Sequence, residues 1–386
     1  MWLLLFPIHA AGGLFLAWLA NWLGLNPWRR GEEAHWTERA RRLWPVRMTA
    51  MTNVLLIPIL LGEVQIVLLP GSSSWWFVSV LAGLFGAMLG NYPLDRAVYP
   101  RLHFRFWLHQ AVATWGLRFG FLGALVLAAC LMPAQFGWGM VTVVGGYLAF
   151  HAALQRGLFL QYLRWVNFLQ PANPRLQEIV NAQSARLGIR PRATWLMGGV
   201  QALAYAFPTT RELAFSQRLL EICTEEEVSV ICAHELAHLT ESKAVLTARM
   251  LGSLSLFPFI FMRPAIHWFG PLGFVVPLVA LLILVPFTRR LSMRMEKRAD
   301  KVGTDSQLNE GVYAGALEKI YRENQVPAVN ASNRQTHPHL YDRMIAASLT
   351  PDYPRPRKAK AMTWIGFLYA VGVGLLFAVV MGRQFH

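Results

Sequence analysis

The chain has 386 residues, of which 55% are hydrophobic and only 15% are charged. This composition excludes an ordinary soluble globular protein and predicts a polytopic membrane protein. The net charge of +15 does not indicate a nucleic-acid partner, because arginines and lysines cluster between apolar runs and no recognition motif accompanies them. The three cysteines, Cys130, Cys223 and Cys232, have no paired spacing, so nothing indicates a disulfide framework or a cysteine zinc site.

Residues 1–155 are predicted to form an N-terminal region of about five transmembrane spans. The first, residues 1–25, is expected to be a retained span, with a cleaved signal peptide as the alternative. Residues 26–50 are rich in Arg and Trp, as is typical of an interfacial loop or surface helix. The remaining spans are expected near residues 52–69, 75–93, 107–132 and 138–155. Basic connections alternate with uncharged ones, which places the chain from Arg156 onward in the cytoplasm.

Residues 156–250 are predicted to form the first part of a cytosolic α+β domain. A helical pattern covers residues 176–187 and ends at a glycine. Three short strand-like runs follow, at residues 193–197, 202–207 and 212–216. A small sheet built from them would give an extended peptide an edge to pair with.

The pattern His-Glu-x-x-His occurs next, in a segment with strong helix signals. Thr224 and Glu227 predict a capping box at the start of this helix. His234 and His238 are four residues apart, so a helix places both imidazoles on one face, where they can bind zinc. Glu235 follows the first histidine and can hold and deprotonate a metal-bound water. The sequence therefore predicts the core of a metal-dependent catalytic site.

Residues 251–287 are apolar again and are predicted to form a transmembrane hairpin, with a re-entrant segment as the alternative. Residues 288–360 are polar and are predicted to be the second part of the domain. Residues 361–386 are expected to form a C-terminal transmembrane helix and a short outward tail.

A catalytic zinc needs a third protein ligand and leaves one position for water. Glu241 lies on the same helix face, but it is about 10 Å from His234, too far to share one ion. Glu296, in a polar segment predicted to be helical, is the best candidate ligand. Asp300 follows one turn later and is expected to orient a ligand histidine through its outer nitrogen. The alternative for this segment is a solvated charged helix beside a membrane.

These motifs resemble those of the membrane zinc metallopeptidase family that contains the CAAX prenyl endopeptidases and the HtpX heat-shock proteases. The segment from His234 to His238 matches the zinc helix of that family. The segment from Ser292 to Asp300 matches its Ser-Arg-x-x-Glu-x-x-Ala-Asp element, except that Met293 replaces the arginine. The resemblance covers roughly residues 170–350.

The resemblance also implies roles for residues outside these two motifs. His337 and Arg343 belong to a late His-Pro and Arg element, which implies that they lie near the substrate carbonyl and stabilise the oxyanion. The segment Ala204, Tyr205 and Ala206 resembles the strand that pairs with extended substrate.

The expected fold is a mainly α polytopic membrane protein of about eight transmembrane helices, with a cytosolic α+β zincin-like metallopeptidase domain that contains a small sheet. The expected function is zinc-dependent endoproteolysis of membrane-associated proteins or peptides, with one Zn²⁺ per chain. We expect an integral protein of the bacterial cytoplasmic membrane, with its active site facing the cytoplasm. Quality control and dedicated processing both remain open. The rival function is a membrane scaffold or transporter with a structural or vestigial zinc site.

Overall fold

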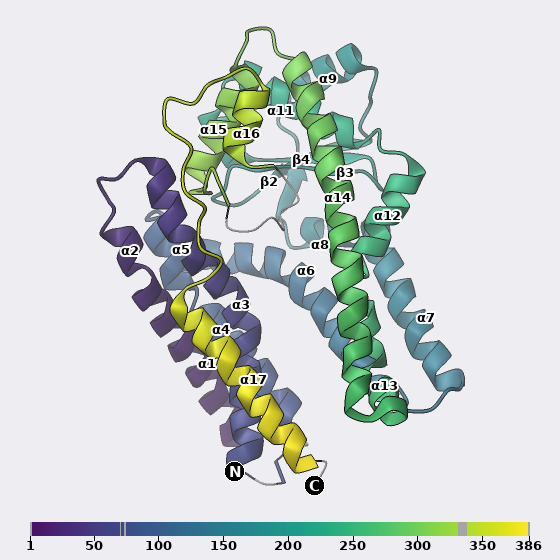
Figure 1. The fold of residues 1–386 in the computed structure, drawn as a ribbon. Helices are drawn as coiled ribbons and strands as arrows, with labels where there is room; N and C mark the ends of the chain where they lie inside the picture. The colour runs from purple at the N-terminus through teal and green to yellow at the C-terminus, as the bar shows by residue number, and fades with distance from the viewer. Residues whose placement is uncertain (1, 70, 73–74, 331–337, 385–386) are drawn as a thin grey trace. The chain divides into compact units, whose positions relative to one another are not determined.

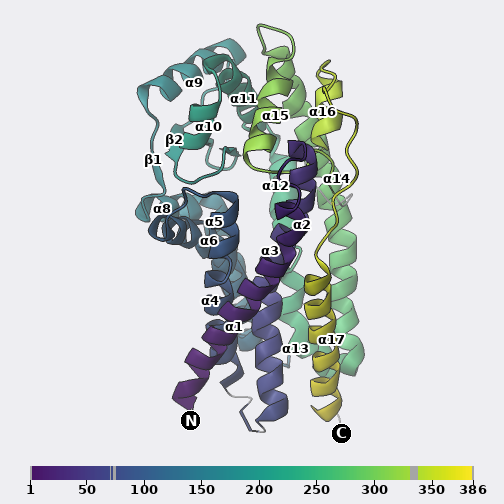
Figure 2. The same ribbon diagram turned by 90° about the vertical axis from the view of Figure 1, so that its left-hand side faces the viewer.

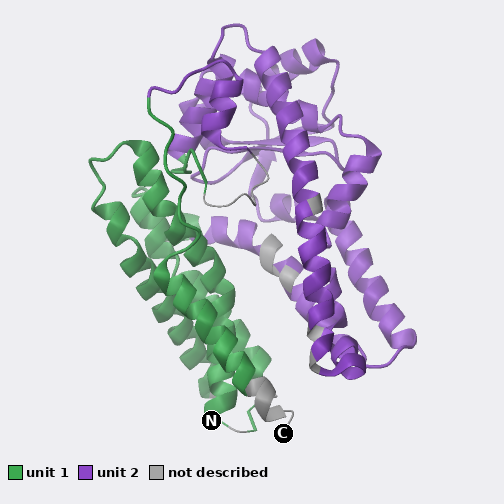
Figure 3. Cartoon of the chain, in the orientation of Figure 1, with its two compact units in different colours: residues 1–107, 324–332, 353–386 green, residues 108–323, 333–352 purple. Residues whose placement is uncertain are grey.

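The computed structural model describes residues 2–69, 71–72, 75–330 and 338–384. The chain is mostly helical, with one four-stranded sheet. It divides into two compact units (Figure 3). Unit 1 comprises residues 1–107, 324–332 and 353–386, and unit 2 comprises residues 108–323 and 333–352. This division follows packing and cuts across the predicted region 1–155, whose boundary stays a prediction.

Unit 1 is a helical bundle that takes helices from both ends of the sequence (Figure 1). Its helices are α1 (Trp2–Gly24), α2 (Asn26–Arg29), α3 (Trp36–Leu68), α4 (Trp76–Leu89), α5 (Tyr92–Val98) and α17 (Trp364–Gln384). Helices α1 and α4 touch backbone to backbone, since a Cβ added to Gly86 would lie 1.9 Å from the carbonyl oxygen of Ala10. Helix α17 packs against α3, and the hydroxyls of Thr49 and Thr363 lie 2.9 Å apart.

Helix α3 is longer than the sequence predicts. It begins at Trp36 and continues without interruption to Leu68, so part of the predicted interfacial segment 26–50 belongs to it. Glu38 forms ion pairs of 2.6 Å and 2.7 Å with Arg41 and Arg42, which stabilise the polar first turns as helix. The run of arginines therefore extends an apolar helix instead of separating two elements.

Unit 2 contains the sheet and the helices around it (Figures 1 and 2). Its helices are most of α6 (Phe104–Leu131), α7 (Trp138–Ala153), the π-helical turn η2 (Leu154–Leu158), α8 (Phe159–Trp165), α9 (Pro174–Leu187), α10 (Gln217–Ile222), α11 (Glu225–His238), α12 (Lys243–Ser253), η3 (Phe257–Phe261), α13 (Met262–Phe269), η4 (Gly270–Phe274), α14 (Val275–Asp305), α15 (Val312–Glu323) and α16 (Leu340–Ala346). Helix α14 runs the length of the unit in both views, from η4 to the region of α11.

The sheet contains β1 (Leu169–Pro171), β2 (Ala193–Met197), β3 (Ala204–Phe207) and β4 (Glu212–Ser216). Their order is β1-β2-β4-β3, with β2 and β4 parallel and the outer pairs antiparallel. The three predicted strands are confirmed, although β3 begins two residues later than expected, while the three-residue β1 was not predicted. Strand β3 lies at one edge of the sheet and also contacts α11.

Four helices within the described residues are long and apolar enough to cross a membrane: Leu4–Arg29, Trp36–Leu68, Trp76–Val98 and Val275–Asp305. The pair Lys243–Ser253 and Phe257–Phe269 meets this criterion only together, and it is bent by 43°. The predicted total of eight transmembrane helices is therefore not confirmed. The bent pair also replaces the first limb of the predicted hairpin 251–287, and it has the form of a broken span or a re-entrant loop.

Candidate metal centre

Helix α11 carries the His-Glu-x-x-His motif and is buried along most of its length. The predicted capping box is confirmed: the Thr224 hydroxyl accepts from the Glu227 amide, and the Glu227 carboxylate accepts from the Thr224 amide. The motif lies in the last turns, where the ring centroids of His234 and His238 are 5.1 Å apart. A well-anchored helix therefore presents both imidazoles side by side.

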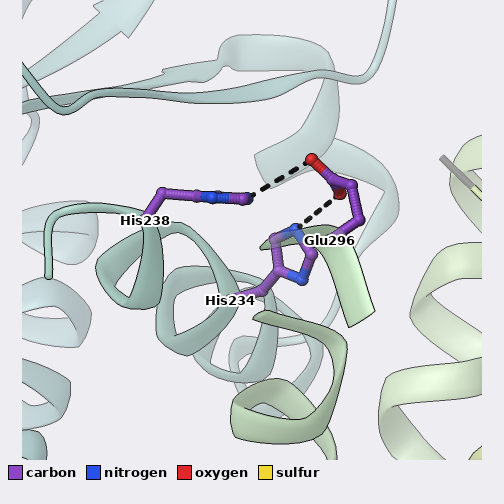
Figure 4. A group of neighbouring side chains, drawn as sticks. All are labelled: His234, His238 and Glu296. Atoms are coloured by element: carbon purple, nitrogen blue, oxygen red, sulfur yellow. Dashed lines mark ion pairs between the residues drawn. The ribbon is translucent and has the colours of Figure 1, made fainter. Parts of the chain in front are cut away.

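Helix α14 brings Glu296 to these two rings (Figure 4). Its two carboxylate oxygens lie 3.7 Å from Nε2 of His234 and 3.6 Å from Nε2 of His238. All three side chains are buried, and one donor atom of each lies within 4.8 Å of the others. A tetrahedral zinc about 2.0–2.2 Å from each donor would hold the donors about 3.4 Å apart. The two distances from the carboxylate to the imidazole nitrogens are close to this value, so the three side chains could hold a metal ion.

The outer nitrogen of His234 is held by a network from α14, α15 and α16. Its Nδ1 lies 2.8 Å from the Tyr313 hydroxyl and 3.3 Å from the Asp300 carboxylate. The Tyr313 hydroxyl donates its only proton to Asp300, over 2.7 Å. Because this oxygen can then only accept from the ring, His234 carries its proton on Nδ1 and presents the Nε2 lone pair to the metal position. Asp300, expected to orient a ligand histidine, lies within 3.3 Å of this outer nitrogen.

Arg343 closes this network. Its Nε and Nη2 donate to the two oxygens of Asp300 over 3.0 Å and 2.6 Å, and Nη2 also donates to the Tyr313 hydroxyl over 3.1 Å. Burial would lower the pKa of Arg343, but the nearby Tyr313 and Asp300 raise it well above its ordinary value. Burial raises the pKa of Tyr313 as well, so its hydroxyl remains protonated. The three hydrogen bonds of the guanidinium are therefore to Asp300 and Tyr313, the groups that hold the outer nitrogen of His234.

The outer nitrogen of His238 has different partners. Its Nδ1 donates to Glu241 over 2.9 Å, and the same carboxylate oxygen accepts from Arg249 of α12 over 2.6 Å. Burial lowers the pKa of His238, but the bond to Glu241 and the neighbouring carboxylates outweigh this effect, so the net pKa is raised. Glu241 is almost fully buried, with 1% of its side chain exposed. This second ring therefore also turns Nε2 toward Glu296.

The roles of Glu241, Tyr313 and Arg249 were not predicted from the sequence. Glu241 was excluded as a metal ligand, and its place on the outer nitrogen of His238 agrees with that exclusion. The expectation that Glu241 lies on the same helix face was wrong, because α11 ends at His238 and Glu241 lies beyond the turn that follows it. Tyr313 and Arg249 come from other helices, and no local pattern marks them.

The remaining predicted site residues have different positions. Glu235 is buried on α11 and is one of the charges that act on His238. Ala204, Tyr205 and Ala206 lie in the edge strand β3, where 46% of Tyr205 is exposed. His337 lies outside the described residues. Cys232, on the same helix as the histidines, is fully buried, and burial raises the pKa of its thiol.

Two comparisons with known proteins agree with this geometry. Residues 170–350 match the sequence profile of peptidase family M48. A protein named as a protease HtpX homolog, from Pyrobaculum islandicum, is 32% identical over 123 residues. The matched part covers 31% of this chain and 34% of that protein, so the chain spans about a third of the length of this relative.

Proposed function

Because residues 170–350 belong to peptidase family M48, we propose that the chain is a zinc-dependent metalloendopeptidase that hydrolyses peptide bonds of membrane-associated proteins or peptides. The observation that carries this proposal is the convergence of Nε2 of His234, Nε2 of His238 and the Glu296 carboxylate. Within the described residues this group has three donors, whereas structural zinc sites are usually closed by four. The donor number therefore supports a catalytic centre over the structural zinc site of a scaffold or transporter.

His234, His238 and Glu296 would hold the ion. A bound zinc supplies a Lewis acid and lowers the pKa of a water molecule toward neutrality. Glu235 would accept the proton of the attacking water and return it to the leaving amine. Its position in sequence, directly after His234 on the same helix, supports this role without making it a ligand.

The networks behind the rings would keep both histidines in the binding tautomer. Asp300 and Tyr313 fix the proton of His234 on Nδ1, and Glu241 does the same for His238. We assign Arg343 a positioning role through Asp300, which its three hydrogen bonds support. Direct contact of Arg343 or His337 with the substrate carbonyl stays a prediction from the family resemblance.

The substrate would bind as an extended segment along β3. This strand is at the sheet edge and contacts α11, so a peptide added there would run beside the helix that carries the metal ligands. The apolar helices of unit 2, such as the first half of α14, support action on substrates at a membrane. We propose a location in the bacterial cytoplasmic membrane, with the site on the cytoplasmic side, from the arrangement of basic segments.

Replacing the general base tests this function. In full-length protein reconstituted in lipid, Glu235→Gln should retain about one zinc per chain and lose cleavage of an unfolded model substrate by about 10²–10⁴-fold. Glu225→Gln is the matched control, since Glu225 lies on the same helix with 72% of its side chain exposed, and it should keep full activity. Full activity in Glu235→Gln would refute the mechanism.

A further inference from the structure

Unit 2 contains a cavity of about 340 Å³ whose wall includes the end of the edge strand. Phe207 is the last residue of β3, and Thr209 and Thr210 lie in the turn that follows. The opposite walls come from α6, the π-helical turn η2 and α8, through residues such as Phe121, Leu154 and Phe159. The rings of Phe159 and Phe207 pack with their centroids 6.3 Å apart. The cavity is thus continuous with the strand proposed to pair with substrate.

The lining indicates an uncharged, apolar occupant. Among the described residues that line the cavity there is no Lys, Arg, Asp or Glu. Three of its polar residues are already bonded to one another: Ser253 lies 2.9 Å from His151 and accepts from Gln155 over 3.3 Å. A charged side chain would lose its hydration here and would find no Lys, Arg, Asp or Glu among these residues, whereas an apolar one would lose only contact with water.

The pairing geometry of β3 directs one substrate side chain toward this cavity. Side chains alternate along a strand, so Tyr205 and Phe207 share one face, and Ala204 and Ala206 share the other. In an antiparallel pair, residues directly opposite each other project to the same face, with Cβ atoms about 4.5–5.5 Å apart. The substrate residue opposite Phe207 therefore projects to the face on which Phe207 lines the cavity.

The shape of the cavity depends on a glycine in η2. Gly157 has a φ of 110°, in the region that favours glycine, and a Cβ added to it would lie 3.1 Å from Cγ2 of Thr210. Single π-helical turns are frequent at functional sites. Here the turn carries Leu154, Gln155 and Gly157 past the end of β3, where all three line the cavity.

We propose that this cavity is the specificity pocket for one large apolar side chain, such as Phe or Leu, of a peptide paired with β3. The proposal rests on the proposed function, because it takes the peptide on β3 to be the substrate. It names a property of that substrate: a bulky apolar residue at a fixed register along the edge strand.

Filling the pocket tests the proposal. Thr209 is exposed and lines the cavity, so Thr209→Trp should occupy it without disturbing the core. The control is Ala185→Trp, on the exposed face of α9 and away from the lining. The probes are fluorescent alanine-based peptides of extended sequence, either all-alanine or with a single Phe placed at each position in turn. Each is bound to full-length protein that also carries Glu235→Gln.

One Phe position should bind more tightly than the all-alanine peptide. Burial of a Phe side chain should give an advantage of about 10–200-fold. Thr209→Trp should remove this advantage and leave binding of the all-alanine peptide unchanged. Phe207→Ala, which enlarges the cavity, should shift the preference from Phe to Trp at that position. Ala185→Trp should change nothing, and unaltered melting temperatures would show that the variants fold.

The proposal is overturned if Thr209→Trp weakens all peptides equally, or if it leaves the Phe preference intact. The experiment measures peptide binding, so its result does not depend on whether the protein hydrolyses the peptide. A wild-type protein that prefers Phe at one position but cleaves no peptide would refute the proposed function and retain the pocket. Cleavage without any side-chain preference at that position would refute the pocket and retain the proposed function.

Discussion

The two histidines of the candidate metal centre each have a buried ring, but different groups hold their outer nitrogens. Behind His234, a network from α14, α15 and α16 contains Asp300, Tyr313 and Arg343. Behind His238, one carboxylate connects the ring to Arg249, on the first limb of the bent apolar pair. The first support joins polar groups from three helices, one of which is α14, and the second is a single carboxylate that links His238 to α12. Stability should therefore depend most on the first, which is the larger network.

The largest expected effect comes from breaking the buried pair behind His234. Asp300→Ala leaves the Arg343 guanidinium, which is 6% exposed, without its carboxylate. We expect a loss of about 3–5 kcal/mol in the free energy of unfolding, because an uncompensated buried charge remains. Denaturant titration of the full-length protein measures it. The double variant Asp300→Ala/Arg343→Met should recover most of this loss, and a double variant as unstable as the single would contradict the explanation.

Next in size is the support of His238. Glu241→Gln keeps the shape of the side chain but removes the charge that holds the Nδ1 proton and pairs with Arg249. We expect zinc affinity to fall by about 10–100-fold, the usual effect of changing a partner of a ligand histidine. Competition with a chromophoric chelator measures this affinity. Glu221→Gln, at an exposed glutamate of α10, is the control. An equal loss of zinc affinity in this control would show that Glu241 has no specific role behind His238.

A smaller effect is expected for Tyr313→Phe. The change removes one hydroxyl, while Asp300 remains 3.3 Å from Nδ1 of His234 and can accept the proton directly. Because one partner survives, zinc affinity should fall by about tenfold or less, at the low end for partners of ligand histidines. The same chelator competition compares it with Glu241→Gln. A larger loss in Tyr313→Phe than in Glu241→Gln would reverse the ranking of the two supports.

The smallest effect is expected for Arg249→Lys, which keeps the charge beside Glu241 but loses guanidinium geometry. We expect only a few-fold change in zinc affinity. Arg249→Met should cost more, because Glu241 would then be a buried carboxylate bonded mainly to His238. If both variants bind zinc as tightly as the wild type, the link from α12 through Glu241 to His238 does not contribute to zinc affinity.

The helix that carries the two histidines could be predicted because its signals are local. A capping box, a spacing of four residues and an apolar run all lie within α11, and three of the four strands were similarly marked by short apolar runs. Glu296 could be proposed only by elimination and family resemblance, since no local rule pairs residues so far apart in sequence. The structure brings it to the histidines through contact of α11 with α14.

Other features depended on packing that no sequence pattern contains. Tyr313 reaches His234 from 79 residues away, and the first turns of α3, which hold the ion pairs of Glu38, lie in a segment expected to be separate from the apolar span. The bend between α12 and η3 was missed because the apolar composition is continuous through it, and composition does not record backbone direction. The pattern of apolar residues predicted where helices form, but not which helices pack against one another.

The packing of α17 against α3 has a consequence for biosynthesis. Residues 1–107 are translated first, yet the bundle they form lacks this helix until the ribosome has passed residue 384. The face of α3 that α17 covers therefore stays exposed while all of unit 2 is synthesised. A pulse-labelled chain should accordingly acquire protease resistance in unit 2 before unit 1, and a truncation that removes α17 should leave the amino-terminal helices sensitive to protease.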